Sequence, residues 1–229
     1  MKKHKNLKYI LSICMILIVG QIFAQNKKAG EEPYPAPAMY DNLTTEEAAF
    51  IALFDDKNIG NTHVYVPRKG EKLGDHEPYG SVISNTYGSF LPSDMQRMVN
   101  VKGSEPRALY SIRGGNGELY VIQAQDFSGK QHIGLYALSN EKLTKIQDLA
   151  SLTCDKSGCK QMDSWLQDID GDTRIDIIQK VMNQKGEMNT KTYRIQRDGS
   201  LKMDEKLTID ETDYVPYDYA APKNIKAKN

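Results

Sequence analysis

The chain has 229 residues, of which 39% are hydrophobic, and its 30 basic side chains balance its 30 acidic ones. A chain of this length can bury one good hydrophobic core, or two small units that share one. The lack of a basic excess argues against nucleic acid as a partner. No stretch after residue 24 is apolar enough to cross a membrane, so no span is expected once residues 1–24 are removed.

Residues 1–24 have the pattern of a secretory signal peptide. Four lysines precede an apolar run, Ile10–Gly20, and Ala24 stands before a polar stretch. The apolar run is shorter than the roughly 20 residues that span a bilayer. Cleavage after Ala24 would leave 205 of the 229 residues, with 26 basic and 30 acidic side chains and a net charge of −4. We therefore expect export to the periplasm, the cell surface or the medium.

Two alternatives apply to this segment. It can stay uncleaved as an N-terminal anchor, or it can carry a lipid on Cys14. The residues before Cys14 faintly resemble a lipobox, but bulky Ile13 stands where that signal needs a small side chain. The apolar run also continues past Cys14, which favours the signal peptide.

Next along the chain, residues 25–42 are polar and rich in proline, and we expect an extended tether. The following segment, 43–106, begins with a helix signal. Thr44 and Glu47 have the spacing of a capping box, and an apolar run follows them. A second short helix is expected from Ser93, and glycines and prolines between the two helices indicate turns and short strands.

Residues 107–212 show short apolar runs separated by turn residues, a texture typical of an antiparallel β-meander. The tail, residues 213–229, contains three tyrosines that we expect to dock on the domain. The fold class is therefore mainly β, with one or two short N-terminal helices. The expected strands of the meander are Ala108–Ile112, Glu118–Gln125, Ile133–Ser139, Leu143–Leu149, Trp165–Ile169, Ile175–Met182, Thr190–Gln196 and Leu201–Lys206.

Two cysteines follow the signal segment, Cys154 and Cys159, in the turn-like sequence C-D-K-S-G-C. In an exported chain such a pair predicts a disulfide. A redox-active pair is the alternative, but the spacing differs from C-x-x-C and no helix signal follows.

The most informative stretch of the chain reads D-I-D-G-D-T-R-I-D. It places Asp168, Asp170, Asp172 and Asp176 at relative positions 1, 3, 5 and 9. Four carboxylates this close repel one another unless a cation lies among them, and a hard cation with six to eight oxygen ligands, calcium above all, suits them. At position 7 only the backbone carbonyl of Arg174 can serve as a ligand. We expect a structural calcium ion, and a solvated turn without metal is the alternative.

This stretch, followed by the apolar Ile177-Ile178, resembles the calcium loop of FG-GAP and VCBS repeats and of integrin propeller blades, which reads D-x-[DN]-G-D-G-x-x-D. Thr173 stands where that pattern has Gly, and Gln179 stands where an EF-hand would need an acid. Shifting the chain by 56 residues also aligns residues 119–123 with residues 175–179. This alignment indicates a faint internal repeat, or else a chance similarity between two meanders. The resemblance implies blade-like, propeller-type repeats that are incomplete, since a full propeller needs at least four blades.

A catalytic constellation is hard to find in the sequence. Asp75-His76-Glu77 is locally polar, but no metal-protease spacing and no G-x-S-x-G motif occurs. We therefore expect a non-enzymatic, calcium-stabilised protein of the bacterial cell envelope that binds a protein or glycan. One alternative is an enzyme that acts on envelope polysaccharide through acids such as Asp75 and Glu77. Another is an accessory subunit of a surface-assembly or secretion machine, docked through its Pro- and Tyr-rich ends.

Overall fold

The computed structural model describes residues 43–58, 60–67, 80–114, 117–125, 129–156, 158–196, 199–205, 207 and 209–219. The expected signal peptide, the tether and the Asp75–Glu77 stretch lie outside these residues. No helix within the described ranges is long and apolar enough to cross a membrane.

Strands dominate the described chain, and the few helices are short, so the expected mainly β fold class is confirmed. The helices are α2 (Thr45–Ile51), α3 (Ser93–Gln96) and the 3-10 turns η1 (Asn85–Phe90) and η2 (Glu211–Asp213). The strands are β1 (Asp55–Asn58), β2 (Thr62–Val64), β3 (Ser81–Val82), β4 (Arg107–Gly114), β5 (Gly117–Gln125), β6 (Gln131–Ser139), β7 (Lys142–Asp155), β8 (Gly158–Gln167), β9 (Asp176–Met182), β10 (Met188–Ile195) and β11 (Leu201–Met203).

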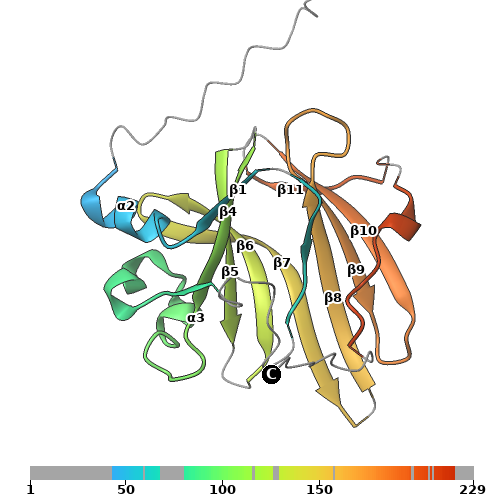
Figure 1. The fold of residues 1–229 in the computed structure, drawn as a ribbon, viewed down its shortest axis with the longest axis horizontal. Coiled ribbons are helices and arrows are strands. Elements are labelled where there is room, and N and C mark those ends of the chain that lie inside the picture. Colours follow the sequence, from blue (N-terminus) through green and yellow to red (C-terminus); the bar gives the residue numbers. More distant parts are fainter. Residues whose placement is uncertain are drawn as a thin grey trace, which may run out of the picture. The chain divides into compact units, whose positions relative to one another are not determined.

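These strands form one open sheet in the order β1-β4-β5-β6-β7-β8-β9-β10-β11. From β4 to β11 each strand pairs antiparallel with the next along the chain, as expected for a meander (Figure 1). At one edge β1 pairs parallel with β4, and the short β3 pairs antiparallel with β4. In the interior of the strand order, β2 pairs antiparallel with β8. The two halves of the meander meet at the β7–β8 hairpin, where residues 151–155 pair with residues 158–162. Further along β8, residues 164–166 pair with β2 instead. The expected blade-like repeat stays a prediction.

The segments matched by the shift of 56 residues occupy equivalent places in this order. Residues 119–123 lie in β5, the second strand of β4–β7, and residues 176–179 lie in β9, the second strand of β8–β11. Their neighbouring strands are also antiparallel in both halves. The internal repeat itself stays a prediction.

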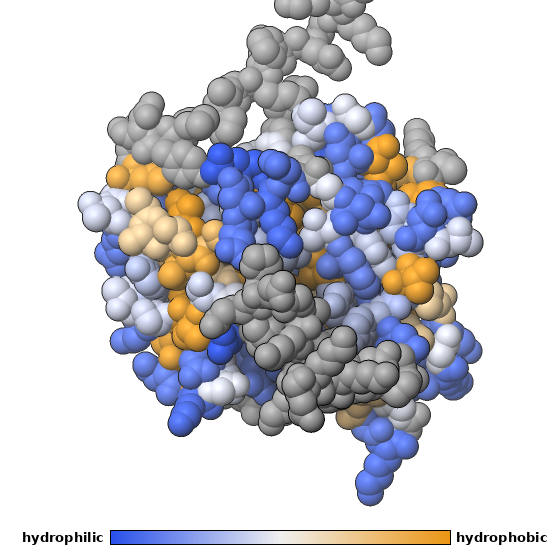
Figure 2. All heavy atoms as spheres, in the orientation of Figure 1, coloured by the Kyte–Doolittle hydropathy of each residue, from blue (hydrophilic) through white to orange (hydrophobic). Residues whose placement is uncertain are grey.

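The alternation of side chains along β5 divides the interior into two cores. Tyr120 and Ile122 face a first core, which α2, η1 and α3 complete with residues such as Phe50. Thr44 starts α2 as predicted, because its Oγ1 accepts the amide of Glu47 at 3.1 Å. In the orientation of Figure 1, apolar side chains reach the surface chiefly along the side where α2 and α3 lie (Figure 2).

The opposite face of β5, with Leu119 and Val121, belongs to a second core. This core unites Ile112 of β4 with Ile195 of β10, two strands far apart in the strand order. The sheet therefore curves around this core. A third, smaller cluster forms where the tail packs Tyr214 on Trp165, with ring centroids 5.5 Å apart.

The tyrosines of the tail dock on the domain, as the sequence predicts. Tyr217 stacks on Tyr65 at 4.4 Å between centroids, and the Tyr219 hydroxyl donates to the carbonyl of Val66. The backbone of Tyr217 is held at both polar atoms: its N–H donates to Asp163 and its carbonyl accepts from Gln161. These contacts fix the tail beside β2 and β8.

Candidate metal centre

The acidic stretch forms the loop between β8 and β9. Gly171 adopts φ +76°, in the left-handed region that glycine favours. Thr173 also lies there, at φ +66°, although its side chain is β-branched. Thr173 is the position where the resembled pattern has glycine, so the loop takes a left-handed backbone conformation there even with threonine.

Asp168 organises the backbone of this loop. Its Oδ1 accepts the amides of Gly171 at 2.8 Å and Asp172 at 3.0 Å, and its Oδ2 accepts the amide of Thr173 at 2.8 Å. The Asp172 amide also donates to Asp170 Oδ1 at 3.3 Å, and the Arg174 amide donates to Asp172 Oδ1 at 2.9 Å. Amides in a loop lack the regular backbone hydrogen-bond partners that a helix or strand provides. The carboxylate oxygens of this loop accept these hydrogen bonds instead, so the segment folds around its own aspartates.

The structure brings together three of the four predicted carboxylates. One oxygen each from Asp168, Asp170 and Asp176 lies within 4.8 Å of the others, close enough for a shared cation. Asp172 is turned aside and pairs with the guanidinium of Arg174, whose Nε donates to Oδ2 at 2.6 Å. The role expected for the Arg174 carbonyl stays a prediction.

The sequence reasoning missed one residue of this cluster, Arg194. From β10, directly opposite Asp176 in the strand register, its Nε donates to Asp176 Oδ1 at 3.0 Å and its Nη2 to Asp170 Oδ2 at 2.6 Å. Its Nη1 lies 3.8 Å from Asp172 and 3.9 Å from Asp204. Counting back along the hairpin between β9 and β10 would have revealed it, but only with the turn at Asn183–Glu187 known.

The electrostatics of the cluster follow from burial and from these arginines. Burial raises the pKa of Asp176, against hydrogen bonds from the Ile169 amide and from Arg194. Burial also acts to raise the pKa of Asp172, but the hydrogen bonds and charge of Arg174 outweigh it and hold that pKa below its usual value. For Arg194, burial opposes the charged form, yet the carboxylates of Asp176 and Asp170 raise its pKa.

The four aspartates of the loop carry two more charges, when all are ionised, than Arg174 and Arg194 neutralise, and Asp204 adds a further carboxylate beside Arg194. A hard cation can therefore still be attracted to Asp168, Asp170 and Asp176, while Arg194 already meets one oxygen each of Asp170 and Asp176. A bound cation would have to share those carboxylates with Arg194 or displace its guanidinium. This competition sets how strongly the site can bind a metal.

Cys154 and Cys159 form a disulfide, as expected, and face each other across the β7–β8 hairpin.

A second polar cluster, which the sequence does not predict, surrounds Asp163. The carboxylate of Asp163, which is fully buried, lies 3.0 Å from Nε2 of His63 and accepts from Gln161. The His63 ring stacks on Trp165 at 4.3 Å, which places this cluster beneath the tail.

Another group of polar residues, which includes Gln123 and Gln125 at the end of β5, lines a cavity. Comparison of the chain with protein-family models, with curated proteins and with solved structures gave no significant match.

Proposed function

We propose that this chain is an exported, calcium-stabilised, non-enzymatic binding protein of the bacterial cell envelope. The observation that carries the calcium proposal is the convergence of oxygens from Asp168, Asp170 and Asp176 within 4.8 Å. The ion would join the end of β8 to the start of β9 and so hold the two halves of the loop together. Its role is structural, because it cross-links strands of the folded sheet.

Export is supported by the N-terminal sequence pattern and by the disulfide, which forms and persists in oxidising compartments. The tyrosines of the C-terminal tail favour a self-contained domain, rather than an accessory subunit that docks on its partner through this tail. They are engaged with their own chain, through Trp165 and Tyr65.

The test of the calcium proposal is thermal unfolding of the purified protein in calcium, in magnesium and in a chelator. At calcium 100 times above its dissociation constant, binding to the folded state would add about 2.7 kcal/mol to the free energy of unfolding. The double variant Asp170→Asn/Asp176→Asn should lose this calcium-induced gain.

The matched control is Asp55→Asn/Asp56→Asn, which removes two exposed carboxylates of β1 outside the loop and should keep the gain. Equal midpoints in calcium and in chelator for the unchanged protein would refute the calcium proposal. A gain that persists in Asp170→Asn/Asp176→Asn would place the ion elsewhere.

A further inference from the structure

A cavity of about 590 Å³ opens at one end of the sheet, across the beginnings of β4 and β6 and the ends of β5 and β7. Its size falls within the range of about 300–1,000 Å³ that is usual for ligand pockets. Arg107 pairs with Gln123 across β4 and β5, and Gln131 pairs with Leu152 across β6 and β7. Because side chains alternate along β5, Gln123 lies on the same face as Val121. The cavity therefore adjoins the second core, but polar side chains take part in its lining.

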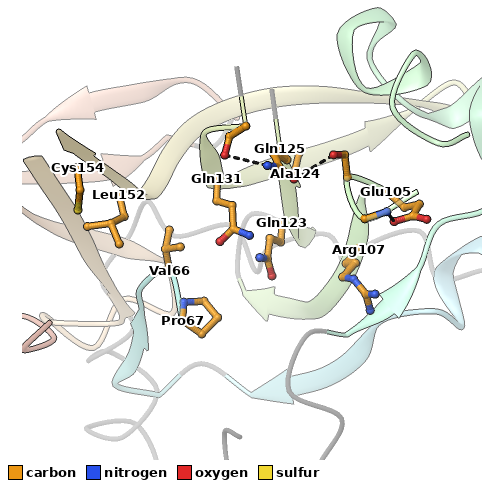
Figure 3. Close-up of a pocket in the computed structure, with 13 residues that line it drawn as sticks. Val66, Pro67, Glu105, Arg107, Gln123, Ala124, Gln125, Gln131, Leu152 and Cys154 are labelled. Atoms are coloured by element: carbon orange, nitrogen blue, oxygen red, sulfur yellow. Dashed lines mark hydrogen bonds between the residues drawn. The ribbon is translucent and has the colours of Figure 1, made fainter. Parts of the chain in front are cut away.

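Gln123 is the residue that points to a ligand. The residue is only 8% exposed, yet its amide makes no hydrogen bond to any other described residue. The neighbouring Gln125 differs, because its amide donates to the Gly129 carbonyl at 2.8 Å and accepts from Ser104 at 3.0 Å. Figure 3 shows the side chains of Gln123 and Gln131 extending into the same space. The amide of Gln123 therefore faces the cavity and is available to hydrogen-bond a molecule that enters it.

Two opposite charges line the same cavity. Arg107 donates from Nη1 to the Gly80 carbonyl at 3.2 Å and forms no ion pair within the described ranges, so most of its five N–H donors have no partner there. Glu105 accepts the Gly103 amide through Oε2 at 2.7 Å, and the described residues offer it no cation. The cavity therefore presents one cation and one anion that do not neutralise each other.

We propose that this cavity binds a zwitterionic amino acid or short peptide. Arg107 pairs with the carboxylate, Glu105 with the ammonium group, and Gln123 and Gln131 with amide or carboxylate oxygens and N–H groups. The apolar wall of Val66, Pro67 and Leu152 packs against an aliphatic side chain. The described lining contains no aromatic ring on which a sugar could stack, which favours a peptide over a glycan.

This proposal deepens the binding role proposed above by naming the class of ligand, and it does not depend on calcium. The test is isothermal titration of the purified protein with alanyl-leucine, free leucine, N-acetyl-alanyl-leucine and alanyl-leucine amide. Alanyl-leucine or leucine should bind. The compound that binds shows whether the cavity takes a dipeptide or a single amino acid. Blocking either charged end should weaken the binding of alanyl-leucine by at least about tenfold.

Two variants test which residue pairs with which charged end of the peptide. Glu105→Gln should weaken the free dipeptide but leave the N-acetyl form unchanged, whereas Arg107→Gln should weaken both at least about tenfold. The control Arg97→Gln removes the same charge from an exposed position outside the cavity and should bind as the unchanged protein does. The blocked peptides probe the unchanged protein, so the test stands even if a variant fails to fold.

Absence of heat for both alanyl-leucine and leucine up to about 10 mM would overturn the proposal. Equal binding of the blocked and free dipeptides would do so as well. The titrations are repeated in calcium and in chelator. Peptide binding both in calcium and in chelator, without any calcium-induced stabilisation, would refute the calcium site and support the peptide site. Calcium-induced stabilisation without peptide binding would support the calcium site and refute the peptide site.

Discussion

The arginine in the acidic cluster allows the sharpest prediction about this protein. Arg194→Gln removes the guanidinium that faces Asp176 and Asp170 at 3.0 and 2.6 Å. The Asp176 carboxylate has no exposed surface and the Arg194 side chain is 16% exposed, so the pair is desolvated. The Asp170 side chain is 41% exposed, so its contact with Arg194 contributes less.

The expected loss follows from this difference in burial. Removing one partner of a buried ion pair typically costs about 3–5 kcal/mol, because the other charge stays buried without compensation. Glutamine keeps a shorter donor at the site, so we expect the lower end, about 3 kcal/mol in chelator at pH 7. For a domain of this size that corresponds to a fall in Tm of roughly 6–12 °C.

Calcium should reverse part of this loss. An ion among Asp168, Asp170 and Asp176 would supply the missing positive charge and no longer compete with a guanidinium for the same oxygens. The calcium-induced gain in stability should therefore be larger in Arg194→Gln than in the unchanged protein. An equal or smaller gain would contradict a shared site.

The pH dependence has a defined sign. Burial raises the pKa of Asp176 above its usual value, and Arg194 opposes that rise, so the variant should have a still higher Asp176 pKa. The folded state then binds this proton more tightly than the unfolded state does. The deficit of Arg194→Gln is therefore full at neutral pH and shrinks as the pH falls through the raised pKa of Asp176.

The assay is urea unfolding in chelator between neutral and mildly acidic pH, followed by the fluorescence of Trp165, the single tryptophan. Arg113→Gln is the control, because its side chain is 49% exposed and its carboxylates lie at 3.6 and 3.8 Å. It should change stability by less than about 1 kcal/mol. A deficit for Arg194→Gln no larger than that of the control, or one that grows on acidification, would refute the reasoning.

Three further predictions concern other parts of the structure. Thr173→Gly should stabilise the protein by about 0.5–1 kcal/mol in urea unfolding, because glycine adopts φ +66° without strain, and any marked destabilisation would count against this. Replacing Cys154 and Cys159 by serine should cost about 2 kcal/mol under oxidising conditions, and reductant should abolish the difference. Tyr214→Ala should cost about 3 kcal/mol and shift the emission of Trp165, since the two rings are in contact, whereas an unchanged spectrum would mean that the tail docks elsewhere.

The sequence could predict what depends on near neighbours in the chain. The cap at Thr44, the disulfide of the β7–β8 hairpin and the order of the meander all follow from residues a few positions apart. Turn chemistry, capping and side-chain alternation act over short distances, so a single sequence carries them fully.

Strands that do not alternate were harder to predict. Asp55–Asn58 is wholly polar and exposed, so nothing in its pattern indicated β1 or its parallel pairing with β4. The polar sequence around Gly158 likewise predicts a turn, although β8 begins there and runs to Gln167. Such segments are strands because a neighbouring strand offers them hydrogen bonds, not because of their own composition.

By itself the sequence also determined that carboxylates gather between β8 and β9. Only the tertiary structure decided that Asp172 turns toward Arg174 and that Arg194 enters the cluster from β10. It likewise decided that Gln123 reaches a cavity, where its amide forms no hydrogen bond with another residue of the described ranges. The physical reason is that strand register and sheet curvature bring together side chains remote in the chain, and both are set by the packing of the whole core, which no short stretch encodes.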